Sequence, residues 1–224
     1  MRFLLFFPFW LILTSCAQLP GLMLSDPSRV PEMQRQCNDL FPKKNMRLVH
    51  SIEARIPGRG IQFMTGLTLL SPGRGQFRSV MMSIEGLVIF DGVYDKEEIR
   101  IFRGIPPFDS PNFARGLLQD VRLMLLRPES QCAETGWEKQ GIPICRYPGR
   151  DGMITDVEMH PDQTAIIRQY VKKSLRRTVR IRPGSQETEL VFHGALGYSL
   201  YLKLLESEEI TAEDFQEMMK VERQ

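Results

Sequence analysis

The chain has 224 residues, with 29 basic and 27 acidic side chains and a formal net charge of +2. A charge so close to balance argues against a dedicated nucleic-acid-binding protein, and the length suffices for one domain with a substantial core. No segment after residue 15 is apolar for long enough to span a bilayer.

The N-terminus carries the pattern of an export signal. Arg2 supplies a positive charge, residues 3–13 are almost wholly apolar, and residues 13–16 read LTSC, which matches the lipobox of bacterial lipoproteins. A transmembrane helix with a buried cysteine is disfavoured, because a span needs about 20 apolar residues. We therefore predict a signal peptide at residues 1–15, followed by Cys16, whose thiol accepts a diacylglyceride and which becomes the new N-terminus.

The segment after Cys16 is predicted to connect the lipid to the folded part. Residues 16–31 are rich in Pro, Gly and Ser, as expected of a tether. A short helix is expected at 31–41, because Pro31 suits the first position of a helix. Residues 32–224 are predicted to form a single domain.

An antiparallel meander is predicted after this helix. Pro- and Gly-rich turns separate the apolar segments at spacings of about 10–15 residues, which favours hairpins over βαβ units. The expected strands lie at residues 47–56, 61–70, 76–84, 86–91 and 98–103.

A helix at 112–126 interrupts the strands after a proline-rich connector at 106–111. Its spacing places Phe113, Leu117, Val121, Met124 and Leu125 on one face. Further strands are expected at 153–159, 163–171, 174–182, 187–193 and 197–205, followed by a C-terminal helix at 212–222 that Thr211 caps. The total is about ten strands.

Three cysteines remain once Cys16 is assigned to the lipid, and an exported protein can form disulfides. Cys132 and Cys145 bracket a loop-like segment, so we predict a Cys132–Cys145 bridge. Pairing of Cys37 with either partner stays open, because sequence alone does not determine connectivity. A zinc site is disfavoured, since the spacing lacks paired cysteines or histidines.

The layout as a whole resembles a known superfamily. A lipobox, a short helix, a long meander, a helix after G-I-P-P-F at 104–108, paired strands at 163–182 and a final strand pair occur in this order. This order resembles the LolA and LolB superfamily, and most closely a poorly characterised family of bacterial lipoproteins within it. The resemblance covers about residues 32–206.

The resemblance implies a mainly β (α+β) fold, an unclosed, curved β-barrel of about ten or eleven antiparallel strands with helices as a lid. It also implies a concave apolar face that takes acyl chains, either of a free ligand or of a lipoprotein. The expected function is a lipid-anchored carrier that faces the periplasm. Ala17, rather than aspartate, follows Cys16, which favours the outer membrane.

Candidate ligand-binding residues come from strands that are apolar on more than one face and from the central helix. A cavity lined partly by flexible methionines would adapt to acyl chains, whereas the alternative is an ordinary packed core. Likewise, the helix either moves as a lid or stays packed on the sheet. The candidates are Phe63, Leu67, Leu69, Phe77, Met81, Leu87, Ile89, Leu117 and Val121.

Two charged patterns have both functional and ordinary interpretations. A basic stretch comprises Arg168, Lys172, Lys173, Arg176, Arg177, Arg180 and Arg182. It could approach anionic headgroups, but a solvated strand face is the favoured interpretation. Asp156, Glu158 and His160 alternate along one strand; they could bind a metal or transfer protons, but a solvated polar face is again favoured.

Catalysis has little support in the sequence. The three histidines lie outside any known nucleophile, metalloprotease or phosphate-binding motif, so we expect no enzyme, no cofactor and no metal. A hydrolase would need an acid, a base and a nucleophile converging around His160 or His193. The main alternative is an assembly lipoprotein that binds an envelope protein instead of lipid, which an exposed apolar patch would indicate.

Overall fold

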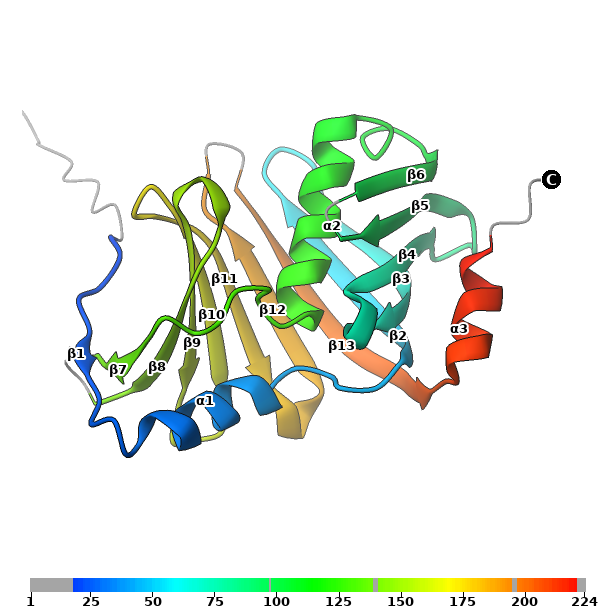
Figure 1. Ribbon diagram of the computed structural model, residues 1–224. Helices are drawn as coiled ribbons and strands as arrows, with labels where there is room; N and C mark the ends of the chain where they lie inside the picture. The colour runs from blue at the N-terminus through cyan, green and yellow to red at the C-terminus, as the bar shows by residue number, and fades with distance from the viewer. Residues whose placement is uncertain (1–17, 97, 139–140, 195–196, 221–224) are drawn as a thin grey trace, which may run out of the picture.

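A single curved sheet dominates the computed structural model, which describes residues 18–96, 98–138, 141–194 and 197–220 (Figure 1). Thirteen strands follow the order β1-β7-β8-β9-β10-β11-β12-β13-β2-β3-β4-β5-β6, so β1 and β6 form the two edges and the barrel is unclosed. No helix in these ranges is long and apolar enough to cross a membrane. The predicted mainly β, open-barrel fold is confirmed.

The ten strands expected from the sequence are all present, and every neighbouring pair is antiparallel. Apolar and polar residues alternate along most of them, so that one face packs inward. Their bounds are β2 Met46–Ile56, β3 Gly60–Ser71, β4 Gln76–Ser83, β5 Val88–Asp95, β6 Glu98–Gly104, β9 Met153–Met159, β10 Ala165–Val171, β11 Ser174–Arg182, β12 Glu187–Phe192 and β13 Tyr198–Glu209.

Three short strands were not predicted: β1 Met23–Leu24, β7 Glu134–Trp137 and β8 Pro143–Pro148. β7 and β8 form a hairpin in the segment expected to be a loop, and β1 pairs with β7. A Cβ atom at Gly136 would lie 2.4 Å from the carbonyl oxygen of Met23, so glycine is needed for β1 to approach. Part of the expected tether therefore packs along the sheet.

Three α-helices accompany the sheet within the described ranges: α1 Val30–Asp39, α2 Pro111–Leu125 and α3 Ala212–Met219. α1 and α2 cover the concave side, and their buried residues join the main apolar core of the sheet (Figure 1). α3 contacts β3 from the outer side, where Arg78 donates a 2.7 Å hydrogen bond to the carbonyl of Met218. Thr211 caps α3, as predicted.

A disulfide connects α1 to β8, with a distance of 2.11 Å between the sulfur atoms of Cys37 and Cys145. The predicted Cys132–Cys145 bridge is therefore wrong, and one of the pairings left open is present instead. The reason is the β7–β8 hairpin, in which Cys145 lies opposite Thr135 and faces α1. Cys132 precedes the hairpin and keeps a free, partly buried thiol.

Loss of this disulfide is expected to lower the free energy of unfolding by about 2–4 kcal/mol. The bond joins residues 108 positions apart, so its removal frees a long loop in the unfolded chain. Urea unfolding of the Cys37→Ala/Cys145→Ala variant measures the effect. Cys132→Ala is the matched control and should cost much less; equal losses in both variants would contradict the pairing.

Candidate functional site

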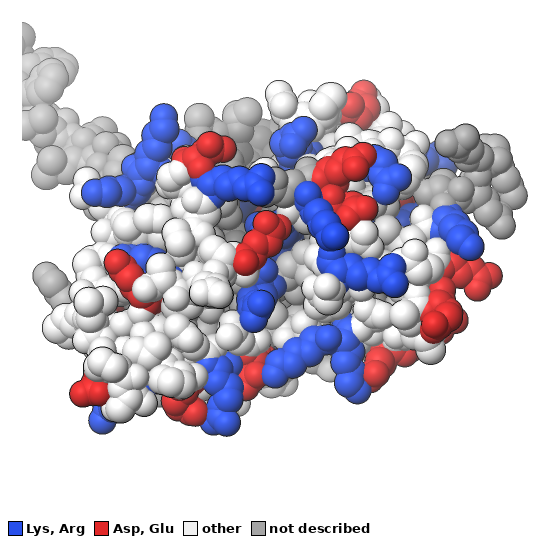
Figure 2. All heavy atoms as spheres, viewed as in Figure 1, with Lys and Arg blue, Asp and Glu red and all other residues white. Residues whose placement is uncertain are grey.

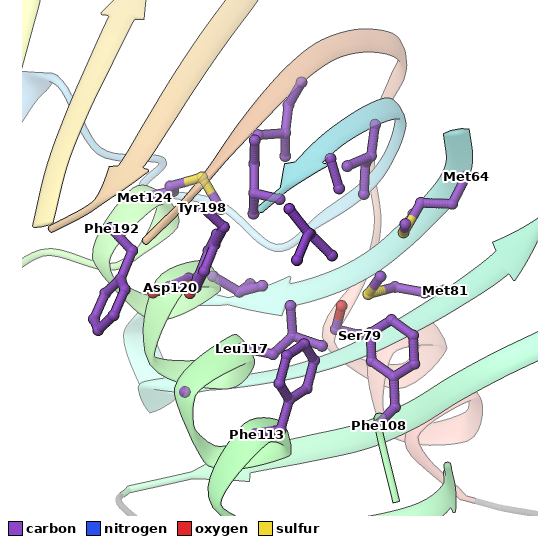
Figure 3. A pocket seen from close by; sticks show the side chains of 18 of the residues that line it. Met64, Ser79, Met81, Phe108, Phe113, Leu117, Asp120, Met124, Phe192 and Tyr198 are labelled. Atoms are coloured by element: carbon purple, nitrogen blue, oxygen red, sulfur yellow. The ribbon is translucent and has the colours of Figure 1, made fainter. Parts of the chain in front are cut away.

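A cavity of about 550 Å³ lies between α2 and the inner faces of β13, β2, β3 and β4 (Figure 3). Its volume is in the range of small-molecule pockets, about 300–1,000 Å³. Met64 and Met81 of the sheet lie across the hollow from Leu117 and Phe113 of α2 in Figure 3. The apolar lining includes Ile52, Ala54, Met64, Met81, Phe108, Phe113, Leu117, Val121, Met124, Leu200 and Leu202.

The hollow arises from strand register and from small residues. Ile52 lies opposite Met64 on one side and Leu202 on the other, so alternate residues of three strands point into the same space. Gly66 and Gly116 both line the cavity. A Cβ atom at Gly116 would meet nothing within 4 Å, so this turn of α2 leaves space that a larger residue would fill.

The cavity opens at one end and is closed at the other. Pro57, Arg59 and Asn112 line the open end and are exposed to solvent, and Phe113 there is 37% exposed. Farther along β3, Thr68 lines the cavity and is only 5% exposed, and the next residue on the same face, Leu70, is fully buried. A long, narrow ligand could therefore enter beside the start of α2 and extend along β3.

Five of the nine candidate ligand-binding residues belong to the cavity lining or to the main apolar core. Met81 of β4 and Leu117 and Val121 of α2 line the cavity. Phe77 and Ile89 belong to the packed core, where the ring of Phe77 stacks on Tyr94 with 5.2 Å between centroids. Phe77 and Ile89 therefore belong to an ordinary packed core, whereas Met81, Leu117 and Val121 lie where the cavity interpretation places them.

The other four candidates lie away from the cavity. Leu67 and Leu69 alternate with Thr68, which lines the cavity, so they point to the outer face, on which α3 packs. Phe63 and Leu87 are 59% and 51% exposed. β3 is apolar on two faces because one lines the hollow and the other is partly covered by α3, which is why the sequence pattern did not separate them.

A buried polar cluster ties α2 to the sheet at one side of the cavity. Asp120 of α2 is fully buried and accepts hydrogen bonds from Arg177 Nε at 2.5 Å and from the hydroxyl of Tyr198. Arg177 also donates to Gln169 Oε1 at 3.1 Å, and its guanidinium lies 5.2 Å from the centre of the Phe192 ring. Asp120, Arg177, Phe192 and Tyr198 all line the cavity.

Within this cluster, the positive charge of Arg177 compensates the negative charge of Asp120. Burial raises the pKa of Asp120, although the nearby Arg177 and the Tyr198 hydroxyl oppose that rise. Burial, followed by the Asp120 carboxylate, raises the pKa of Tyr198, so its hydroxyl stays protonated and donates. Two buried groups of opposite charge in contact are tolerated together, whereas either one alone would be costly.

The alternating acidic residues of β9 do not form a solvated face, so that favoured interpretation is wrong. Asp156 and Glu158 are fully buried, because arginines of the neighbouring strands cover them. Arg146 Nε and Nη2 each lie 2.8 Å from the carboxylate of Asp156, and Arg168 pairs with Glu158. Among the described residues, no group of three His, Cys, Asp or Glu side chains could hold a metal ion.

Acidic partners also accompany much of the basic stretch. Arg180 pairs with Glu189 at 3.3 Å and Arg182 with Glu187 at 3.5 Å, across the β11–β12 hairpin. Figure 2 shows acidic and basic side chains interspersed over the viewed face. This arrangement suits a solvated strand face for Arg180 and Arg182. That interpretation is wrong for Arg177, which is buried and pairs with Asp120. Contact with anionic headgroups stays a prediction.

His50 of β2 faces the cavity and is predicted to make stability depend on pH. Burial lowers its pKa from 6.5 to about 4, so the folded protein favours the neutral imidazole. As the pH falls from about 6.5 towards 4, the unfolded state gains the proton first, and up to about 3 kcal/mol of stability is lost. Wild type and His50→Gln, unfolded by urea at several pH values, should differ in slope across this window; parallel curves would contradict the assignment.

Comparison with known proteins identifies the fold. Neither the family models nor the curated proteins contain a match to this sequence. Among solved structures, a LolA superfamily protein from Nitrosomonas europaea superimposes with a TM-score of 0.52 and 12% identity, over 82% of this chain and 94% of that chain. The protein has a LolA-like fold.

Two further structures are more distant. A DUF1329 family protein from Desulfovibrio piger gives a TM-score of 0.43 and 11% identity over 84% of this chain and 95% of that chain. A domain from Vibrio parahaemolyticus, provisionally described as an outer membrane lipoprotein-sorting protein, gives a TM-score of 0.36 and 6% identity, over 84% of this chain and 96% of that chain. Within the LolA-like fold of this chain, the cavity under α2 is the candidate functional site.

Proposed function

We propose that the protein is a lipid-anchored carrier of a hydrophobic, acyl-type ligand, attached to the outer membrane and facing the periplasm. The observation that supports this proposal is the apolar cavity of about 550 Å³ between α2 and the sheet, open at one end. Each methylene group that moves from water into such a cavity contributes about 0.8 kcal/mol. No catalytic step is part of the proposal.

The N-terminal segment supports attachment close to a membrane. Cys16, the proposed lipidation site, lies outside the described residues, but Gln18 forms a β-bridge with Ser174. The backbone amide of Leu19 donates a 3.0 Å hydrogen bond to the carbonyl of Lys173. Because a single residue separates Cys16 from Gln18, acylation of Cys16 would hold the β10–β11 turn near the bilayer.

Native mass spectrometry of the exported Cys16→Ser protein tests the carrier proposal. This variant lacks its own acyl chains, so none of them can occupy the cavity. We expect a bound mass of lipid size in a one-to-one complex after gentle purification from a bacterial periplasm. A protein that stays free of lipid, even after incubation with long-chain amphiphiles, would reject the carrier. Mass analysis of wild type, with Cys16→Ser as control, separately tests for the diacylglyceride.

Exposed apolar side chains favour a second candidate, an assembly lipoprotein that binds an envelope protein. Ile61 and Phe63 at the start of β3, and Ile84 and Leu87 around the β4–β5 turn, are between 51% and 74% exposed. Such clusters often mark protein contacts. If this candidate is right, wild type cross-links to one defined partner in cells and Phe63→Ser does not. Neither wild type nor the variant then carries bound lipid.

A further inference from the structure

A polar strip crosses the otherwise apolar wall of the cavity. It consists of His50 on β2, Thr68 on β3 and Ser79 on β4, and all three residues line the hollow. Thr68 and Ser79 are direct cross-strand partners, and His50 lies opposite Gly66, two residues before Thr68. In Figure 3, Ser79 lies next to Met81 on the sheet side of the cavity.

The strip has hydrogen-bonding capacity that the protein does not use. Thr68 and Ser79 are only 5% and 3% exposed, yet their hydroxyls and the His50 ring have no side-chain hydrogen bond within the described ranges. None of these polar atoms is among the fully enclosed ones, so they open into the hollow. Buried polar groups nearly always have partners, so this strip suits a ligand that supplies them.

The charges around the strip exclude an anionic partner. His50 is neutral near pH 7, because burial lowers its pKa to about 4. Arg177 lines the cavity but is held by Asp120, and Arg59 lies at the exposed open end. A carboxylate or phosphate at the strip would be buried without a free cation, which is strongly unfavourable.

The strip lies deep in the cavity. Thr68 and Gly60 are about eight residues apart on β3, which corresponds to roughly 26 Å at about 3.3 Å per residue. Gly60 adjoins the open end, and the fully buried Leu70 lies beyond the strip. A head group on the strip would therefore direct its chain outward past Ile52 and Met64 towards the opening.

We propose that the cavity binds a free, single-chain amphiphile whose head is uncharged and both donates and accepts hydrogen bonds, such as a monoacylglycerol. The head lies inward on His50, Thr68 and Ser79, and the chain runs to the open end. This inference rests on the proposed carrier function and narrows it. In this orientation the head group lies at the enclosed end, so the proposed cargo is a free amphiphile and not an acyl chain linked to a protein.

Titration of the full-length Cys16→Ser protein with three probes of equal chain length tests the head-group assignment. The probes are monooleoylglycerol, oleate and oleoyl lysophosphatidylcholine, each kept below its aggregation limit at neutral pH. We expect monooleoylglycerol to bind at least tenfold more tightly than the other two. Equal or tighter binding of oleate or the lysophospholipid would overturn the head-group assignment while leaving the carrier intact, and failure of all three probes would overturn both.

Removal of the two hydroxyls tests the location. Thr68→Val/Ser79→Ala preserves side-chain shape and should weaken monooleoylglycerol binding about tenfold, as expected for two neutral hydrogen bonds. The ligand-free variant should be as stable as wild type or more so, because unpartnered buried hydroxyls are lost. Thr65→Val, on the outer face of the same strand, is the matched control. Unchanged binding in the double variant would overturn the assignment of the strip.

Discussion

Replacing Gly116 by phenylalanine is expected to reduce affinity for a long-chain amphiphile about a hundredfold without destabilising the protein. Gly116 lies in the middle of α2 and faces the cavity, where an added Cβ atom meets nothing within 4 Å. A phenyl ring there would occupy the space that the ligand needs. At the same time, glycine inside a helix costs about 1 kcal/mol relative to alanine, so the substitution removes an unfavourable residue.

Gly116→Ala is the control that separates these two effects. A single methyl group leaves most of the cavity open, so binding should remain close to wild type while stability rises by about 0.5–1 kcal/mol. Binding is measured by titration and stability by urea unfolding of the same samples. If Gly116→Phe folds normally and binds as well as wild type, the ligand lies elsewhere and the cavity loses its assigned role.

The fold was largely predictable because most of its signals are local. Alternating apolar residues indicate most strands of β2–β6 and β9–β13, and Pro- or Gly-containing turns mark many of the hairpins between them. The β7–β8 hairpin was missed because Gly136 is required by a contact with Met23, which is distant in the sequence. From the sequence alone, Gly136 cannot be distinguished from a glycine in a loop. The disulfide depends on how α1 docks against β8, which spacing between cysteines does not encode.

The cavity was less predictable, because it depends on small side chains at positions in several different elements. Ala54, Gly66 and Gly116 are unremarkable by themselves, and they line one hollow only because the fold brings β2, β3 and α2 together. The polar cluster is visible in the sequence in one respect: the charged residue Arg177 interrupts the apolar inward face of β11. The structure explains this interruption, because Arg177 pairs with Asp120, a charged residue on the apolar face of α2.

Removal of the Asp120 carboxylate is the second large effect that we expect. Asp120→Ala should lower the free energy of unfolding by about 3–5 kcal/mol, because it leaves Arg177 buried without its counter-charge. Replacing both partners by apolar residues, Asp120→Leu with Arg177→Met, should recover most of that loss. If the double variant is as unstable as the single one, the uncompensated charge is not the cause.

The same ion pair decides whether α2 can act as a lid. It joins the middle of the helix to β11, and the Tyr198 hydroxyl adds a link to β13, so α2 can leave the cavity only when these contacts break. Asp120→Asn weakens the link and keeps the side-chain shape. If α2 moves, its amides should exchange faster in this variant while those of β2 and β3 stay protected. If α2 is permanently packed, helix and strands should lose protection together, because both would then exchange only through global unfolding.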